Sequence, residues 1–322
     1  MRISAERLAA EAEATGFRPE ILEKVIHLLG LLEDLRKHPY LHGRLALKGG
    51  TALNLFVFDV PRLSVDADLN YIGAADLETM LEERPRVEEA LQAVLARRGY
   101  SVRRAPSEHA GGKLHLTYPS STGQPANLEV DLNYMLRVPL WPVAARDSSH
   151  VGSYVARDVQ LLDIHELAAG KLAALFARSS PRDLFDAHRL LTLAPLDPKP
   201  LRLGFVIYGA MNRHDWRTIR IEDVALDQKA FDDQLVPLLR RGPLAATGGS
   251  AELRARLVDE PQRHVSALLP FSAGEAELLD RLLDHGETMP LLLTDDEQLA
   301  ARIVQHPMLN WKALNVREHK SR

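Results

Sequence analysis

The spacing of apolar residues divides the chain into a first part with helices and strands and a second part with helices alone. Apolar residues recur at every third or fourth position in residues 3–15 and 19–36, which predicts two amphipathic N-terminal helices. Residues 77–98 show the same spacing among many charged residues and predict a third helix. Each of these helices therefore has one apolar side that can pack on a core.

Shorter runs in the first part have the pattern of strands. In residues 65–70 and 128–134 every second residue is apolar, so one side of each strand packs on a core and the other side carries polar side chains. The predicted strands lie at residues 45–47, 65–70, 100–104, 113–118 and 127–135. The first two of them flank a glycine turn.

From about residue 196 the pattern becomes helical. Pro195, Pro198 and Pro200 mark this change. Helices are predicted at residues 199–212, 229–240, 251–269, 273–285, 294–305 and 309–317. We therefore expect two domains: residues 1–195, with N-terminal helices in residues 1–38 packed on the core, and residues 196–322.

Two aspartates lie on one side of the strand at residues 65–70. Asp66 and Asp68 are two positions apart, so both side chains point the same way. Neighbouring carboxylates repel each other unless a cation binds between them. Hard divalent cations prefer oxygen ligands and share them with substrate phosphates, so we expect Mg²⁺, or Mn²⁺, at this pair. An Asp-x-Asp pattern is also common on solvated strands, where it binds nothing.

The turn before this strand fits the phosphates that such a cation accompanies. Gly49 and Gly50 let backbone N–H groups approach an anion closely, and Thr51 opens a short helix whose N-terminus favours negative charge. A Gly-Gly turn between a strand and a helix is often only a turn. Combined with Asp66 and Asp68, however, it predicts a metal–triphosphate site.

A third carboxylate lies on the last predicted strand of this part. In residues 128–134 the odd-numbered positions are polar, and Asp131 is in the middle of them. If this strand pairs with the strand of Asp66 and Asp68, three carboxylates converge, and Asp131 both binds metal and accepts a proton from an attacking hydroxyl. The alternative is a solvated strand face.

Two strings around the glycine turn resemble a known toxin family. Residues 48–53, KGGTAL, and residues 62–68, RLSVDAD, are similar to the AbiEii/AbiGii-type toxins, which include the MenT-like toxins and belong to the DNA polymerase β nucleotidyltransferase superfamily. The resemblance implies an α/β (α+β) nucleotidyltransferase core with a mixed sheet, plus N-terminal helices and a helical C-terminal domain. It also implies phosphate-binding roles for Lys48, Gly49, Gly50, Thr51, Arg62 and Ser64.

A lysine on the apolar side of the helix predicted at residues 163–178 is a further candidate. Lysine is rarely buried without a partner, so either the Lys171 ammonium reaches water or it faces the active site and binds the triphosphate. In the toxin family a lysine and a later Arg-Asp pair complete the nucleotide site. The resemblance thus implies roles for Lys171, Arg182 and Asp183.

Purely structural roles are open to the same residues. Ser180, Pro181 and Asp183 match the start of a helix with a capping box. Arg182 and Asp186 are four positions apart and are spaced to pair with each other.

Composition excludes several classes of protein. The chain has 322 residues, no cysteine and 46% hydrophobic residues, so disulfides and thiolate metal sites are absent. No apolar run is long enough to span a bilayer, and the N-terminus lacks an apolar signal core, so we expect a cytoplasmic protein without membrane contact. With a net charge of −4, any RNA contact must come from a local basic patch.

One cluster in the helical part has the composition of such a patch. Tryptophan interleaved with arginine can stack on unpaired bases and hold phosphates. The candidates are Arg213, Trp216, Arg217 and Arg220. A solvated helix end is an equally good explanation.

Together these features predict an enzyme that acts on nucleotides. The resemblance implies a toxin that transfers nucleotides from a nucleoside triphosphate to RNA, with the tRNA 3′ end as the target, and that is neutralised by a cognate antitoxin protein in a toxin–antitoxin or phage-defence system. Two alternatives stay open. One is a nucleotide-binding regulatory module without transfer, and the other is a nucleotidyl- or phosphotransferase that modifies a protein or a small molecule.

Overall fold

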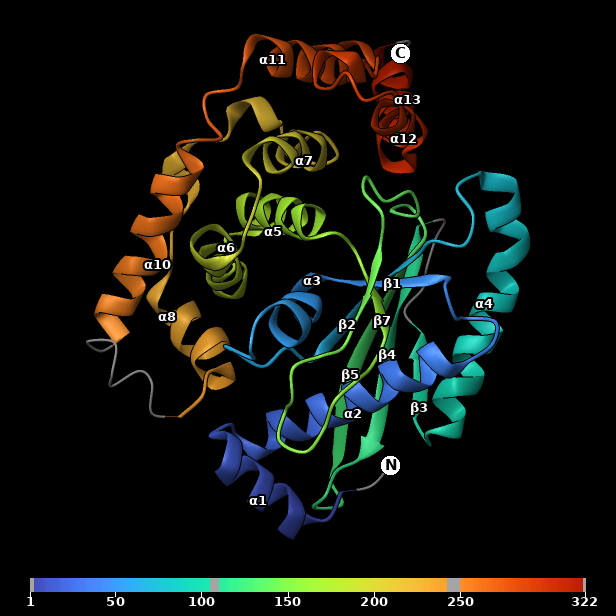
Figure 1. Cartoon of the computed structure of the whole chain (residues 1–322), viewed down its shortest axis with the longest axis vertical. Coiled ribbons are helices and arrows are strands. Elements are labelled where there is room, and N and C mark those ends of the chain that lie inside the picture. Colours follow the sequence, from blue (N-terminus) through green and yellow to red (C-terminus); the bar gives the residue numbers. More distant parts are fainter. Residues whose placement is uncertain (1–2, 105–109, 242–249, 321–322) are drawn as a thin grey trace. The chain divides into compact units, whose positions relative to one another are not determined.

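The computed structural model of the chain describes residues 3–104, 110–241 and 250–320 (Figure 1). Contacts between Cα atoms group the chain into two compact units. Unit 1 comprises Met1–Arg137, Val143–Leu162 and Val236–Pro243. Unit 2 comprises Val138–Pro142, Asp163–Leu235 and Leu244–Arg322.

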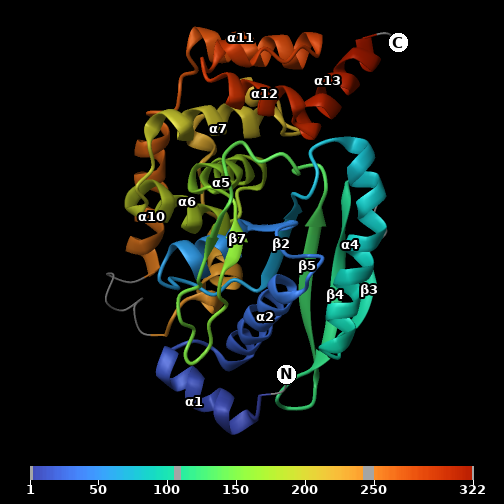
Figure 2. The same cartoon turned by 45° about the vertical axis from the view of Figure 1, so that its right-hand side comes forward.

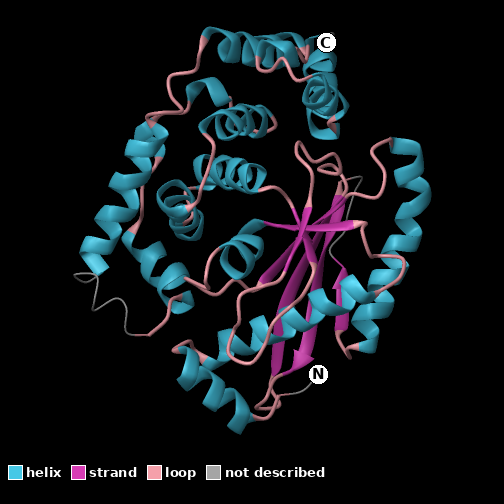
Figure 3. Ribbon diagram, in the orientation of Figure 1, coloured by secondary structure: helices cyan, strands magenta, loops and turns pink. Residues whose placement is uncertain are grey.

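Unit 1 is built on a mixed sheet (Figure 3). In the described part of the chain the sheet has seven strands in the order β3-β4-β5-β2-β1-β7-β6. The strands are β1 (Leu45–Lys48), β2 (Asp66–Tyr71), β3 (Ser101–Arg104), β4 (Gly111–Pro119), β5 (Pro125–Asn133), β6 (Ala144–Arg146) and β7 (Val159–Leu161). The pairs β2–β5 and β1–β7 are parallel, and the other pairs are antiparallel. The expected α/β class with a mixed sheet is therefore confirmed.

Two helices of unit 1, α2 (Pro19–Lys37) and α4 (Leu77–Arg97), pack on the apolar side of this sheet. The unit also contains α1 (Ala5–Thr15) and α3 (Gly49–Ala52) with the π-turn Leu53–Val57. Figure 1 shows α2 crossing the sheet, and Figure 2 shows α4 alongside β3 and β4. Leu91 of α4 lines a small pocket with Leu114 of β4 and Leu132 of β5, so α4 packs on the apolar side.

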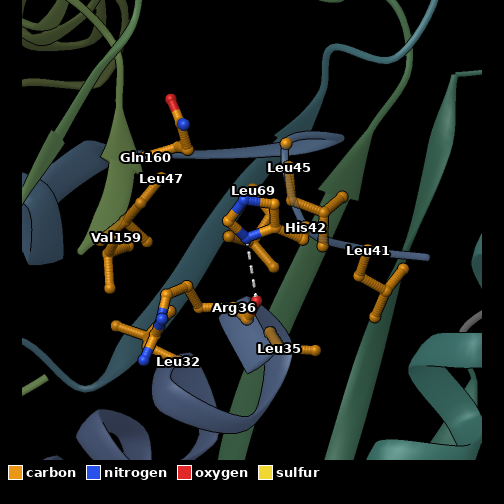
Figure 4. Close-up of a pocket in the computed structure, with 11 residues that line it drawn as sticks. Leu32, Leu35, Arg36, Leu41, His42, Leu45, Leu47, Leu69, Val159 and Gln160 are labelled. Carbon is orange, nitrogen blue, oxygen red and sulfur yellow. Dashed lines mark hydrogen bonds between the residues drawn. The ribbon is translucent and has the colours of Figure 1, made fainter. Parts of the chain in front are cut away.

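A second small gap separates α2 from the centre of the sheet (Figure 4). Its volume is about 30 Å³, and its walls are mainly leucines from α2, β1 and β2. His42 lies at its rim, with Nδ1 3.2 Å from the carbonyl oxygen of Arg36. A gap of this size holds a water molecule but no substrate.

Unit 2 is helical. Its longer helices are α5 (Ile164–Arg178), α6 (Pro181–Leu193), α7 (Pro198–Ala210), α10 (Ser250–Val265), α11 (Ala273–Asp280), α12 (Glu297–Gln305) and α13 (Pro307–Lys320). Contacts place α5 and α6 in this unit, whereas the sequence analysis assigned residues 163–195 to the first domain. The predicted domain boundary stays a prediction. No helix in the described ranges is long and apolar enough to cross a membrane.

Two expectations about elements were wrong. The single helix predicted at residues 229–240 is instead three short pieces, α8 (Gln228–Ala230), a π-turn (Phe231–Leu235) and a 3₁₀ turn (Val236–Leu238). Pro237 lacks a backbone N–H, which limits a continuous helix there. Strands β6 and β7 were missed, because three residues are too few to show a period.

Candidate active site

Three of the predicted acids lie on the polar side of the sheet. Asp66 and Asp68 lie on β2, and Asp131 lies on β5 directly opposite Asp68. On the other side of Asp68, Lys48 of β1 is its partner in register. Residues directly opposite in adjacent strands point to the same side, so Lys48, Asp68 and Asp131 form one charged row across three strands.

The environment of Asp131 raises the basicity of its carboxylate. Burial raises the pKa of the Asp131 carboxyl, and the carboxylate of Asp68 raises it further, against the opposing effect of the Lys48 ammonium. This carboxylate is therefore a stronger base than an exposed aspartate, as proton abstraction from a hydroxyl requires.

The residue after Lys48 must be glycine for Asp68 to occupy its place. Gly49 has a φ of +71°, and a Cβ atom built on it would lie 2.1 Å from Oδ2 of Asp68. The first glycine of the turn thus makes room for a carboxylate as well as for a left-handed backbone. Gly49 and Asp68 therefore lie side by side, and the metal–triphosphate site expected at the turn and the acids stays a prediction.

We expect Gly49→Ala to lower both stability and activity. The left-handed conformation alone costs about 1–2 kcal/mol for a residue with a Cβ atom, and Asp68 must also move. The matched control is Gly43→Ala, because Gly43 has a φ of +73° but no atom within 4 Å of the place where a Cβ atom would lie. Urea unfolding should show a larger loss for Gly49→Ala, and an equal loss would show that Asp68 adapts freely.

Thr51 links the glycine turn to the segment that leads into β2. Oγ1 of Thr51 lies 2.5 Å from the carbonyl oxygen of Asp66 and 3.0 Å from Oγ of Ser64, and both side chains are buried. Arg62 is also buried, and its guanidinium donates to the carbonyl oxygen of Leu63. These contacts give Thr51, Ser64 and Arg62 structural roles, and their phosphate-binding roles stay predictions.

The acids do not form a closed metal centre. Among the described residues, no three acidic or histidine side chains lie close enough together to hold a metal ion. The neighbouring carboxylates of Asp68 and Asp131 are nevertheless the oxygen donors that Mg²⁺ prefers, and this ion usually completes its shell with water and substrate phosphates. The donor set therefore fits a metal that arrives with a nucleotide.

Two of the downstream candidates, Lys171 and Asp183, lie in a buried ion cluster within unit 2, whereas Arg182 is exposed. Nζ of Lys171 lies 2.8 Å from Oδ1 of Asp183 and 3.0 Å from Oδ2 of Asp186. The Lys171 residue is 7% exposed, so its ammonium does not reach water as a snorkelling lysine would. Arg178 also donates to Asp183.

The charges of this cluster balance each other. Burial alone would raise the pKa of Asp183, but the ammonium of Lys171 and the guanidinium of Arg178 outweigh it and hold the pKa below its usual value. The expected role of Lys171, Arg182 and Asp183 in binding nucleotide stays a prediction.

The structure corrects the expected RNA patch at two residues. Trp216 is 0% exposed and packs against Phe176 and Phe205, so its indole is not available to stack on a base. The guanidinium of Arg217 is paired with Asp215, Asp280 and Asp284. Three carboxylates engage this guanidinium, so it is not free to bind a phosphate. Arg213 and Arg220 are exposed. Their RNA-binding role stays a prediction, without the support of Trp216 and Arg217.

A polar cluster beside the acids was missed by the sequence analysis. Nζ of Lys113 on β4 lies 2.8 Å from Oε2 of Glu129 on β5, and Nδ1 of His115 lies 3.1 Å from Oε1 of the same carboxylate. Glu129 is directly opposite Asp66 in the sheet. The alternation of Lys113 and His115 with leucines in the strand predicted at 113–118 could have indicated this cluster.

Known proteins resemble this chain over most of its length. The family model described as nucleotidyl transferase AbiEii toxin, type IV TA system, matches residues 30–259. This chain belongs to the AbiEii nucleotidyltransferase toxin family. The match spans the glycine turn, all three acids of the sheet and helices α5 and α6 of this AbiEii protein. No curated protein sequence matches it.

A solved structure shows the same fold. MenT4, a nucleotidyltransferase toxin from Mycobacterium tuberculosis, superposes with a TM-score of 0.60 at 18% identity, over 94% of this chain and 98% of that chain. At this identity the likeness shows the fold of the AbiEii protein and leaves its substrate open.

Proposed function

We propose that this AbiEii protein transfers a nucleotide from a nucleoside triphosphate to RNA in a reaction that depends on Mg²⁺ or Mn²⁺. The observation that carries the proposal is the direct register of Asp68 and Asp131 beside the Gly49 turn. Two adjacent carboxylates next to an anion-binding turn suit a metal–triphosphate complex.

Two groups of residues would have separate roles in this reaction. The backbone of Gly49, Gly50 and Thr51 would bind phosphates, and Asp66, Asp68 and Asp131 would hold the metal ion. When bound, this ion would neutralise charge on the phosphates and orient them.

The transfer itself exchanges one bond for another. The acceptor hydroxyl oxygen forms a bond to the α-phosphorus, the bond between the α- and β-phosphates breaks, and pyrophosphate leaves. A carboxylate oxygen of Asp131 takes the hydroxyl proton. Such reactions depend mostly on positioning and on charge stabilisation.

Among RNAs we propose the tRNA 3′ end, the target implied by the family resemblance. The type IV toxin–antitoxin family implies an antitoxin partner, and we propose a protein encoded with the toxin as that partner.

The test is incubation of the purified chain with each labelled nucleoside triphosphate and total RNA, with Mg²⁺, Mn²⁺ or excess chelator. Label in RNA that depends on the metal supports the proposal. Label found in protein or in a small molecule, and not in RNA, would show that the acceptor is not RNA. Nucleotide binding without any transfer would favour the regulatory module.

A further inference from the structure

The polar side of the sheet carries a set of basic side chains beyond the acids, on strands β3 and β4. Lys113 on β4 is directly opposite Asp131, and His115 on β4 is directly opposite Glu129. Arg103 on β3 is directly opposite His115. Residues in register across adjacent strands share a side. Arg103, Lys113 and His115, the β3–β4 basic row, therefore flank the acids on the same side of the sheet.

The partners of the basic row are exchangeable. The side chains of Lys113 and Glu129 are 45% and 37% exposed, and Arg103 is exposed as well. The hydrogen bond to Glu129 raises the pKa of Lys113, so the ammonium stays charged. An exposed ion pair of this kind is weak, because water and salt screen it. A phosphate can therefore take the place of Glu129 on the ammonium.

The basic row lies on the side of the acids from which an acceptor hydroxyl would approach. The glycine turn is on the β1 side of Asp68, and the basic row is on the opposite side, beyond Asp131. In phosphoryl-type transfer the attacking oxygen and the leaving oxygen lie roughly in line on opposite sides of the phosphorus. If the pyrophosphate leaves near the turn, the attacking hydroxyl approaches from the β4 side.

We propose that the β3–β4 basic row binds backbone phosphates of the RNA strand whose terminal hydroxyl attacks the nucleotide. The acids at 66, 68, 129 and 131 repel a polyanion, and Arg103 and Lys113 supply the opposite charge next to them. A cationic drug or an uncharged protein hydroxyl gains nothing from this row, which favours nucleic acid. The inference rests on the proposed function and adds the surface that holds the acceptor.

The double variant Arg103→Gln/Lys113→Gln tests it in the full chain. We expect the KM for RNA to rise on the order of tenfold while kcat and the KM for nucleotide stay near those of the parent. The slope of log binding against log salt should flatten by about 1.4, or roughly 0.7 for each lost contact with a single strand. Lys113→Arg keeps the charge and should retain most of the affinity.

The matched control is Arg97→Gln. Arg97 is an exposed arginine at the end of α4, the helix that packs on the apolar side of the sheet. This variant loses a cation from unit 1 without touching the row, and it should match the parent in both KM and salt slope.

The outcomes separate the two proposals. If the parent protein labels no RNA, the proposed function fails. If the parent labels RNA and the double variant has the parent's KM and salt slope, the proposed function stands and the basic row is not the acceptor surface. Thermal melting of each variant confirms that a changed KM is not a loss of fold.

Discussion

Replacement of Asp68 by asparagine is expected to abolish nucleotide transfer and leave the protein folded. Asparagine keeps the shape that fits against Gly49 but removes the charge that binds a cation. Loss of one preorganised electrostatic group typically costs on the order of 10²–10³-fold in rate. Asp68 is directly opposite Asp131, so the substitution also relieves repulsion between two carboxylates, and the melting temperature should not fall.

The measurement has two parts, transfer rate and thermal stabilisation by nucleotide with Mg²⁺. The parent should be stabilised by this pair of ligands, since they bind only the folded state, and Asp68→Asn should not be. Asp59→Asn removes one exposed carboxylate from the preceding turn and should behave as the parent. A folded Asp68→Asn protein with parental activity would remove this aspartate from the reaction.

Replacement of Lys171 by methionine is expected to destabilise the protein strongly. The substitution leaves Asp183 and Asp186 buried without the ammonium that lies between them. Breaking a buried ion pair by removal of one partner typically costs about 3–5 kcal/mol of unfolding free energy. Urea unfolding of the variant measures this loss.

The control for this prediction is Lys229→Met. Lys229 pairs with Asp233 in unit 2, but its side chain is 84% exposed, so its loss should leave the urea midpoint unchanged. If Lys171→Met unfolds at the parental urea concentration, the cluster does not stabilise unit 2. Any loss of transfer in that folded variant would then be evidence for a direct role of Lys171.

The sequence predicted which residues share a face, but not which strands are neighbours. Alternation placed Asp66 and Asp68 on one side of β2, and it placed Asp131 on the polar side of β5. That Asp131 lies opposite Asp68 depends on the register of two parallel strands far apart in the chain. The register is set by packing of the apolar side, which a pattern within one strand does not contain.

The sequence pattern likewise did not predict which side chains from different helices contact each other. The apolar stripe around Lys171 indicated burial, whereas its carboxylate partners come from the next helix. Trp216 was expected at the surface because arginines surround it in the sequence. Its indole instead fills a space left by a glycine, since a Cβ atom on Gly209 would lie 1.9 Å from Nε1 of Trp216.

The parallel pairing of β2 with β5 has a consequence for synthesis on the ribosome. Helix α4 and strands β3 and β4 are made between the two paired strands, and β4 must join β5 before the order of the sheet is complete. Pairing across such a long loop is a late and slow event in folding. A nascent chain that ends before β5 carries Asp68 without Asp131. The pair of Asp68 and Asp131 therefore forms only after β5 has been translated and has paired with β2.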